Sequence, residues 1–330
     1  MKNAITDIPG IEVGQAQDLH ALTGVTVILC RKGAVGGVDV RGSAPGTRET
    51  DLLHPLNLVQ KVHAITLAGG SAFGLDAASG VMKYLDEQKI GFNTATGTIP
   101  IVPAAILFDL HLGRSDIRPT AEMGYRAAAT ANAGPVAEGN VGAGTGATVG
   151  KILGIRNAMK SGLGTSSLRI GAGVVVGAIV AVNAFGDVIH PKTGDILAGA
   201  RSIGSGSLRL GEKGYFVNTL EWMKTFAGRT VLSFATKANT VIGVVATNAK
   251  LTKPETNKMA QMAHDGLARV ICPAHTMLDG DTIFALATGE KKSDVTTVGA
   301  FAAEALATAC LRAVRAARSA AGLPGLGDDD

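Results

Sequence analysis

The stretch NTVIGVVA, residues 239–246, decides the fold, because a polar pair leads directly into an uninterrupted apolar run. An apolar run without polar alternation is typical of a strand that is covered on both faces. Five further stretches have the character of strands, and several of them are also apolar throughout: residues 25–30, 64–68, 174–182, 230–234 and 282–287. The sequence therefore predicts a layered domain with a buried sheet.

Helical segments lie between and after these strands. The residues TKPE at 252–255 form a capping-box pattern with an early proline, so a helix is expected from there to about residue 270. Two more helices are expected over 74–87 and about 295–318. Because strands and helices mix without strict alternation, the pattern favours the mixed α/β (α+β) class over a doubly wound sheet.

Length and composition limit the organisation of the chain. Its 330 residues suffice for one large domain or two ordinary ones. No Pro/Ser-rich linker and no repeat of fixed period divides it, so we expect a single domain over residues 1–330. Only 4% of the residues are aromatic, so the core must consist mainly of Ala, Val, Ile and Leu.

Charge and cysteine content argue against several classes of protein. The net charge of +4 is spread without a basic stripe interleaved with aromatics, which argues against nucleic-acid binding. The N-terminus lacks the apolar core of a signal peptide, and the most apolar run, 174–182, is too short to cross a bilayer. Cys30, Cys272 and Cys310 suit reduced thiols. We therefore expect a cytoplasmic protein that binds neither a membrane nor a nucleic acid.

Two patterns that resemble cofactor or metal sites are incomplete. GGSAFG at 69–74 differs from the order G-x-G-x-x-G, so it predicts a tight strand-to-helix turn rather than a nucleotide site. His111, His190, His264 and His275 lie far apart, and the close pair Cys272 and His275 has no second pair at ligand spacing. The sequence predicts no cofactor and no metal.

The glycine-rich segment 134–151 is expected to form an irregular loop. Such a segment lets a backbone approach a ligand or another chain closely. A mobile surface loop explains the composition equally well, so both interpretations stay open.

The dipeptide Asn239-Thr240 gains meaning from its position. A threonine at the start of a buried strand can be held against the carbonyl that precedes it. Attack by its hydroxyl would shift the acyl group from nitrogen to oxygen, and water would complete the cut. The new N-terminus would carry a nucleophile together with an amine whose pKa, about 7.7–8.0, suits a general base.

Asp279 and Asp281 stand just before the strand at 282–287. In an extended chain residues i and i+2 point to the same side, so both carboxylates could face one site. They could hold the ammonium form of the Thr240 amine, orient its hydroxyl and titrate as a pair. A calcium-like or plain D-G-D turn explains the same residues, and the sequence alone favours that simpler interpretation.

Four longer motifs carry a family resemblance: ITDIPGIEVG at 5–14, LAGGSAFGL at 67–75, NTVIGVVATN at 239–248 and HTMLDGDTIFA at 275–285. Over nearly its whole length the chain resembles the self-processing aminopeptidase/amidase family of N-terminal-nucleophile-type hydrolases. That family includes β-aminopeptidases, D-amidase/esterases and nylon-oligomer hydrolases, and the last motif is most similar to the nylon-oligomer branch. The resemblance implies an αββα four-layer sandwich and a tetrameric oligomer. It also implies self-cleavage into an α chain, 1–239, and a β chain, 240–330, which stay together.

The family pattern assigns roles residue by residue. It makes Thr240 the nucleophile and Asn239–Thr240 the cleaved bond. Asp279 and Asp281 match its paired acids, where other branches carry Ser and Glu.

Three further positions match the family in part. Lys151 matches a lysine beside the nucleophile, and Asn183 matches the amide that donates to the oxyanion. Phe108 stands where relatives place an active-site tyrosine, so a hydroxyl donor is absent there.

Together these observations predict a cofactor-free hydrolase that cleaves amide bonds through an acyl-enzyme. Its expected substrates are small peptides or aminoacyl oligomers such as 6-aminohexanoate oligomers. One rival is a self-processing acyltransferase of the ornithine acetyltransferase type. The other is a binding protein whose chain never cleaves.

Overall fold

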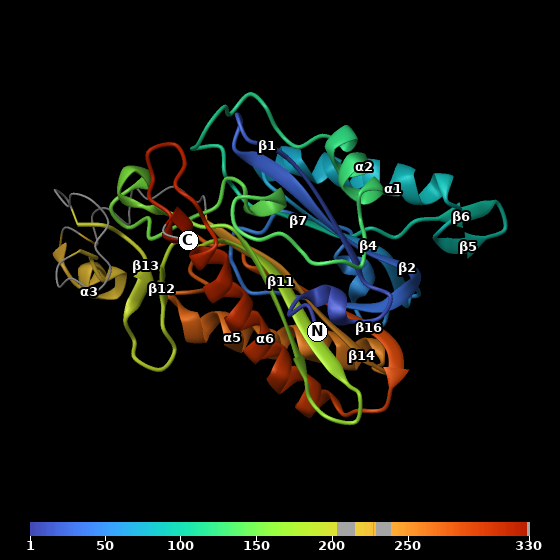
Figure 1. The fold of residues 1–330 in the computed structure, drawn as a ribbon. Helices are drawn as coiled ribbons and strands as arrows, with labels where there is room; N and C mark the ends of the chain where they lie inside the picture. Colours follow the sequence, from blue (N-terminus) through green and yellow to red (C-terminus); the bar gives the residue numbers. More distant parts are fainter. Residues whose placement is uncertain (203–214, 227, 229–238, 329–330) are drawn as a thin grey trace.

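The computed structural model describes residues 1–202, 215–226, 228 and 239–328, and within them one mixed sheet of nine strands forms the middle of the molecule (Figure 1). The strand order is β10-β11-β14-β16-β2-β4-β7-β3, and β1 pairs with β2. The strands are β1 (Glu12–Asp18), β2 (Thr23–Val40), β3 (Thr47–Arg48), β4 (Lys61–Ala68), β7 (Ala104–Ile106), β10 (Leu163–Arg169), β11 (Val175–Asn183), β14 (Thr240–Ala249) and β16 (Thr282–Lys291).

The long strand β2 divides this sheet into two halves. Its first part is antiparallel to β1 and β4, and its last part is antiparallel to β16, with Val38 opposite Phe284. The β2–β4 register shifts between Leu29 and Ala34, where β2 passes from one half to the other. Strands β1, β4, β7 and β3 form one half, and β16, β14, β11 and β10 form the other.

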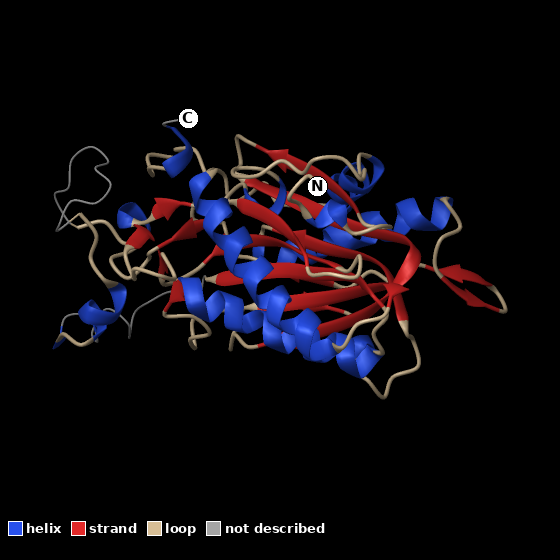
Figure 2. Ribbon diagram, turned by 60° about the horizontal axis from the view of Figure 1, so that its bottom comes forward, coloured by secondary structure: helices blue, strands red, loops and turns tan. Residues whose placement is uncertain are grey.

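Three buried apolar cores separate four layers. Helices α1 (Ala77–Glu87) and α2 (Ala121–Ala129) cover the first half-sheet. Helices α5 (Lys253–Val270) and α6 (Val295–Arg315) cover the second (Figure 2). The third core lies between the two half-sheets. The molecule is therefore an αββα sandwich, and the expected fold is confirmed.

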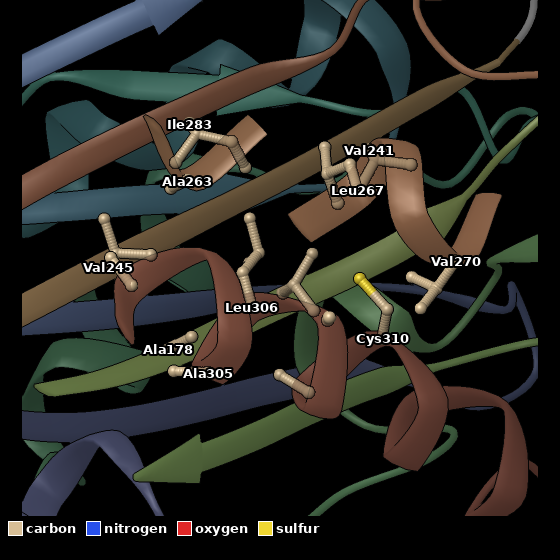
Figure 3. Packing of buried hydrophobic residues seen from close by; sticks show 14 of the residues in the cluster. Ala178, Val241, Val245, Ala263, Leu267, Val270, Ile283, Ala305, Leu306 and Cys310 are labelled. Carbon is tan, nitrogen blue, oxygen red and sulfur yellow. The ribbon is translucent and has the colours of Figure 1, made fainter. Parts of the chain in front are cut away.

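Neighbouring residues of β14 point into different cores. Val241 and Val245 lie in the core under the helices, with Leu306 of α6 (Figure 3). Ile242 and Val244 lie in the core between the half-sheets. Both faces of β14 are thus buried, which explains why its sequence shows no polar alternation.

The expected helices are confirmed with small changes. Thr252 and Glu255 form the capping box of α5, which ends at Val270. Helix α6 ends at Arg315, short of the expected 318. The segment 74–87 joins a 3-10 helix, Ser71–Asp76, to α1. The expected strand at 230–234 lies outside the described residues.

The glycine-rich segment 134–151 does not form a mobile surface loop, because residues 142–150 are all buried. A Cβ on Gly144 would lie 2.1 Å from the nitrogen of Leu163, and one on Gly150 would lie 2.0 Å from the nitrogen of Ala200. Neighbouring backbone occupies the space of a side chain, so these positions require glycine. The segment approaches other parts of its own chain closely.

Helix α6 is, in the described part of the chain, the one helix long and apolar enough to cross a membrane. Its most apolar window is 61% buried inside the fold, and the helix packs on α5, β10 and β11. It is therefore a core helix of the sandwich.

Short elements complete the fold. They are β5 (Phe92–Thr94), β6 (Gly97–Ile99), β8 (Thr148–Val149), β9 (Met159–Lys160), β12 (Asp187–Ile189), β13 (Ile196–Ala198), β15 (Ile271–Cys272), α3 (Thr219–Met223) and the further 3-10 helices Ile5–Asp7, Asp51–Leu53, Gly142–Gly144, Ile155–Asn157 and Leu326–Asp328.

Candidate active site

Two strand ends bring Thr240 and Asn183 together. Thr240 is the first residue of β14 and lies opposite Asn183, the last residue of β11. Residues directly opposite in an antiparallel pair share a face, and here it is the face toward the core between the half-sheets. Both residues are buried. The candidate nucleophile and the candidate amide donor are thus neighbours.

The carbonyl oxygen of Asn239 accepts two hydrogen bonds. The Thr240 hydroxyl donates one of them. The N–H of Gly280 donates the other at 2.9 Å. Donors on a carbonyl oxygen stabilise the negative charge that develops there when the carbon is attacked. The hydroxyl that would attack already lies against the bond that would be cut.

Gly280 has no room for a side chain. A Cβ at this position would lie 2.5 Å from the carbonyl oxygen of Ala44 and 2.9 Å from Oγ1 of Thr240. The other edge of the segment is held by residues 41–44, where the Ala44 N–H donates to the oxygen of Asp279 at 2.9 Å. In the D-G-D motif the sequence drew attention to the two acids, yet the glycine between them lies against Thr240.

The amide of Asn183 is held in one orientation. Its Oδ1 accepts hydrogen bonds from Lys151 Nζ at 2.7 Å and from the N–H of Thr148 at 3.1 Å. Its Nδ2 donates to the carbonyl oxygen of Phe108 at 2.9 Å. The structure therefore brings together four of the residues expected from the sequence: Phe108, Lys151, Asn183 and Thr240.

The side chain of Lys151 changes its charge near neutral pH. Burial lowers the pKa of Lys151 to about 7, although the carboxylate of Asp279 opposes this shift. Its Nζ also donates to the backbone oxygen of Asn183 at 2.9 Å. A lysine with this pKa exchanges between ammonium and amine at neutral pH, as residues of active sites often do.

Asp279 and Asp281 share one face of the chain, as their spacing predicted, but it is not the face of the Thr240 hydroxyl. The side-chain position of Gly280 points at Thr240 Oγ1, so its two neighbours in the extended chain point away. Within the described residues, neither carboxylate hydrogen-bonds to that hydroxyl. The acids can therefore act on the backbone around Thr240 more directly than on its hydroxyl.

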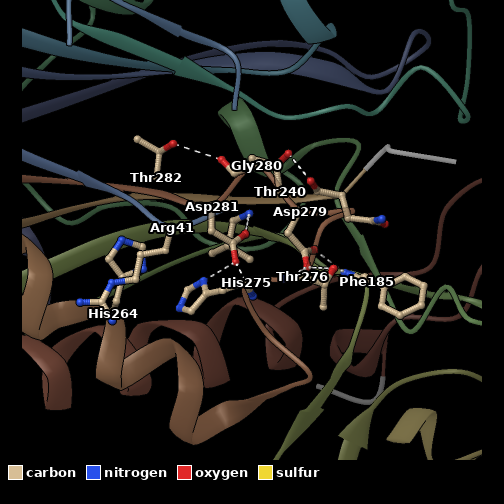
Figure 4. Close-up of polar contacts among 12 residues, drawn as sticks. Arg41, Phe185, Thr240, His264, His275, Thr276, Asp279, Gly280, Asp281 and Thr282 are labelled. Atoms are coloured by element: carbon tan, nitrogen blue, oxygen red, sulfur yellow. Dashed lines mark hydrogen bonds and ion pairs between the residues drawn. The ribbon is translucent and has the colours of Figure 1, made fainter. Parts of the chain in front are cut away.

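Each acid is bound by several donors (Figure 4). Asp281 Oδ1 accepts the N–H of Val241 at 2.7 Å. Asp279 Oδ2 accepts the hydroxyl of Thr276 at 2.6 Å. Burial and the nearby charge of Asp281 raise the pKa of Asp279. The two carboxylates therefore influence each other, as expected of a close pair.

His275 belongs to this cluster, although the sequence offered no reason to connect it with catalysis. Its Nδ1 lies 2.7 Å from Oδ2 of Asp281. Its neighbour Cys272 does not complete a metal site with it: among the described residues no group of three His, Cys, Asp or Glu side chains is placed to hold a metal ion.

An open cavity of about 340 Å³ is lined by none of the expected site residues, but one of its lining residues, His111, packs against Phe108. The ring centroids of His111 and Phe108 are 4.8 Å apart. Burial and the positive charge of Lys151 lower the pKa of His111. Leu112, Leu323 and the exposed Arg156 also line the cavity. Its size is typical of a site for a small molecule.

Asp109 and Lys160 are a second pair of buried ionisable groups. Asp109 accepts hydrogen bonds from the N–H of Gly70 at 2.7 Å and the hydroxyl of Thr23 at 2.8 Å. Lys160 Nζ donates to backbone oxygens of the glycine-rich segment, among them that of Thr145 at 3.1 Å. Burial raises the pKa of Asp109 to about 6 and lowers that of Lys160 to about 7. The tight turn expected at 69–74 is confirmed, and a carboxylate of the same chain binds it.

The family model described as peptidase family S58 matches residues 3–326. The chain belongs to peptidase family S58. It is therefore a hydrolase that acts on peptide or amide bonds, and its membership does not favour the acyltransferase rival.

Relatives of this S58 peptidase support the same conclusion. An uncharacterized aminopeptidase of Mycobacterium tuberculosis is 45% identical over 345 residues, which cover 98% of this chain and 96% of the relative. The 6-aminohexanoate-oligomer endohydrolase of Kocuria sp. is 32% identical over 323 residues, which cover 94% of this chain and 85% of the relative. The resemblance to nylon-oligomer hydrolases is confirmed, and the identity with the mycobacterial aminopeptidase is higher.

A solved structure agrees with the fold of this S58 peptidase. The L-aminopeptidase D-Ala-esterase/amidase from Ochrobactrum anthropi, described as a variant of the Ntn hydrolase fold, superposes with a TM-score of 0.70 at 19% identity. The match covers 96% of this chain and 87% of that chain.

Proposed function

We propose that this S58 peptidase cuts its own chain between Asn239 and Thr240 and then uses Thr240 as the nucleophile for hydrolysing amide bonds. One observation carries the proposal: the Thr240 hydroxyl and the Gly280 N–H bind the same carbonyl oxygen, that of Asn239. This arrangement supports the proposal, because the hydroxyl that would attack and a donor to the oxyanion meet at the bond that would be cut.

Self-cleavage takes two steps. Oγ1 of Thr240 attacks the carbonyl carbon of Asn239, the C–N bond breaks, and the hydroxyl proton moves to the nitrogen. Water then hydrolyses the ester, which leaves a carboxylate on Asn239 and a free amine on Thr240. In both steps the Gly280 N–H stabilises the oxyanion.

Substrate hydrolysis reuses the same geometry. The substrate carbonyl must take the place of the Asn239 carbonyl, because the same oxygen attacks both. The Gly280 N–H then binds the new oxyanion, with the amide of Asn183 as the second donor. The free amine accepts the hydroxyl proton and passes it to the leaving group. Asp279 and Asp281 stabilise its ammonium form.

Linear aminoacyl oligomers are the substrates we favour. A relative with 32% identity is named a 6-aminohexanoate-oligomer endohydrolase. The cavity that His111 lines combines the apolar Leu112 and Leu323 with the cationic Arg156. These groups suit a methylene chain that ends in a carboxylate. We place the leaving half of the substrate in this cavity.

A comparison of two substrates tests this assignment. Linear 6-aminohexanoate oligomers with a free C-terminal carboxylate are compared with the same oligomers as C-terminal amides. We expect a KM about tenfold lower for the acids in the wild type, since a hydrogen bond between charged groups contributes about 1.5–3 kcal/mol. The difference should disappear in Arg156→Gln. Equal KM values in the wild type would refute the carboxylate subsite. Hydrolysis of amino-acid amides alone would refute oligomers as substrates.

Water is the acyl acceptor in this proposal. Turnover with and without ornithine separates hydrolysis from transfer, and we expect ornithine to leave the products unchanged. An N-acylornithine as the main product would favour the acyltransferase rival.

We also propose that both chains stay together and that the cleaved units form a tetramer in the cytoplasm, as the family resemblance implies. Light scattering should give about four times 33.5 kDa. The mass of a single unit would contradict the tetramer.

A further inference from the structure

His275 contacts Asp281, the acid that binds the backbone next to the candidate nucleophile. His275 contacts Asp281 twice, through its backbone N–H at 3.2 Å and its Nδ1 at 2.7 Å, and both contacts are to Oδ2. The other oxygen of Asp281 accepts the N–H of Val241 at 2.7 Å. One buried carboxylate therefore links His275 to the peptide that joins Val241 to Thr240 (Figure 4).

The donor atom of His275 follows from its partner. An ionised carboxylate only accepts hydrogen bonds, so Nδ1 of His275 carries the hydrogen. Among the described residues no protein atom hydrogen-bonds to Nε2 of His275, which is buried. The ring is thus held through one nitrogen, and that nitrogen points at Asp281.

The backbone of His275 also favours this contact. Its φ of 57° lies in the left-handed region, where residues with a Cβ are disfavoured. Such a conformation persists when the surrounding contacts fix it, and it occurs often at functional sites. Here it directs the backbone N–H and the ring of one residue to the same carboxylate oxygen.

His264 of α5 supports the ring but has different partners. The two ring centroids are 4.8 Å apart in an edge-to-face arrangement. Nε2 of His264 is 3.0 Å from the backbone oxygen of Asp39, and burial lowers the pKa of His264 to about 4. His264 is therefore a neutral neighbour at pH 7.

We propose that His275 is a positioning residue that orients Asp281 and, through the Val241 N–H, fixes the N-terminal end of β14 where Thr240 reacts. The proposal rests on the function proposed for Thr240. His275 touches neither the substrate nor the reacting atoms. Its removal should therefore lower kcat and the rate of self-cleavage while KM stays nearly constant.

Two substitutions at residue 275 separate the effect of the side-chain donor from the effect of the backbone conformation. Asparagine tolerates a positive φ and carries an N–H donor near the place of Nδ1. Glycine adopts the same φ without strain and keeps the backbone N–H, but it has no side-chain donor. We expect His275→Gly to lower kcat on the order of 100-fold, the effect of a small misplacement of reacting groups. We expect His275→Asn to stay within about fivefold of the wild type, and both to keep the wild-type KM within threefold.

The controls identify which idea fails. Thr240→Ala is assayed in parallel: if it still cleaves or turns over, the proposed function fails whatever residue 275 does. If Thr240→Ala is inert and His275→Gly retains wild-type kcat, only the role of His275 is overturned. Equal losses in the Asn and Gly variants also overturn it. Should the Gly variant not fold, His275→Ala replaces it, because alanine keeps the Cβ that this φ already carries but has no side-chain donor for Asp281.

Discussion

The two faces of the chain at residues 239–241 and 279–281 carry different chemistry. The face toward the core between the half-sheets holds Thr240, with Asn183 and Lys151 beside it. The face toward the helices holds Asp281 and His275, which lies against a histidine of α5. The first face carries the groups that would make and break bonds. The second carries buried acids that bind backbone N–H groups on the side away from the Thr240 hydroxyl.

The separation has an electrostatic reason. A carboxylate in contact with an oxyanion would oppose the charge that forms in the transition state, whereas one behind the strand can still stabilise an ammonium group. The faces nevertheless influence each other. Burial lowers the pKa of Lys151, while Asp279 and Asp281 raise it from across the strand. The comparison teaches that one β-strand can separate bond making from charge stabilisation and still couple them.

Removal of the Thr240 hydroxyl, the proposed reactive oxygen, should have the largest effect on the first face. Thr240→Ala should leave the chain uncleaved and lower kcat by more than about 10⁴-fold, as the loss of a nucleophile does. Intact mass and a hydrolysis assay measure both effects. Thr240→Ser keeps a hydroxyl and should still cleave. Turnover by the Ala variant at a rate near that of the wild type would refute Thr240 as the nucleophile.

The next largest effect should come from Gly280, which lies between the two faces. In Gly280→Ala the new methyl meets Ala44 and Thr240 at 2.5 and 2.9 Å, so the N–H that binds the Asn239 oxygen must move. Loss of an oxyanion donor lowers rates by about 10²–10³-fold. The measurement is the half-time of self-cleavage in newly made protein.

Gly289→Ala is the matched control for that variant. Its φ of 87° is positive, so an added methyl strains the local backbone, but no atom lies within 4 Å of that methyl. It should lose some stability and cleave at the normal rate. If Gly280→Ala cleaved as fast as Gly289→Ala, the Gly280 N–H would not be the donor.

A pH dependence tests the lysine of the reactive face. The pKa of Lys151 is about 7 in the folded chain and about 10.4 when unfolded. Between these values the unfolded state binds more protons, so this lysine makes the free energy of unfolding rise with pH. Relative to that of Lys151→Met, the free energy of unfolding of the wild type should rise from pH 7 to 9, by at most about 1.4 kcal/mol per pH unit. Urea unfolding at several pH values measures it. A difference independent of pH would show that the lysine is not buried in this way.

The smallest expected effect concerns Phe108. Phe108→Tyr restores the hydroxyl that the family pattern has there, on a ring that packs against His111, which lines the cavity. Because Asn183 and Gly280 are the proposed donors to the oxyanion, we expect kcat/KM to change by less than about fivefold. A rise of more than 100-fold would show that the oxyanion site is incomplete without that hydroxyl.

Much of the fold could be predicted because its strands are long apolar runs and its helices carry ordinary caps. The closeness of Asn183, Lys151 and Thr240 followed from the family resemblance, and the structure places them together. The face of each residue could not be predicted, since it depends on the register between β14 and residues 279–281. The roles proposed for Gly280 and His275 could not be predicted for a related reason: they depend on a backbone N–H and on a left-handed φ, which leave little trace in a single sequence.

The central claim is tested most directly by the masses of the purified wild-type chains under denaturing conditions, together with N-terminal sequencing. Self-cleavage should give two chains, residues 1–239 and 240–330, and the second should begin Thr-Val-Ile-Gly. A fully active protein that consists of one intact chain of 33.5 kDa would contradict the account.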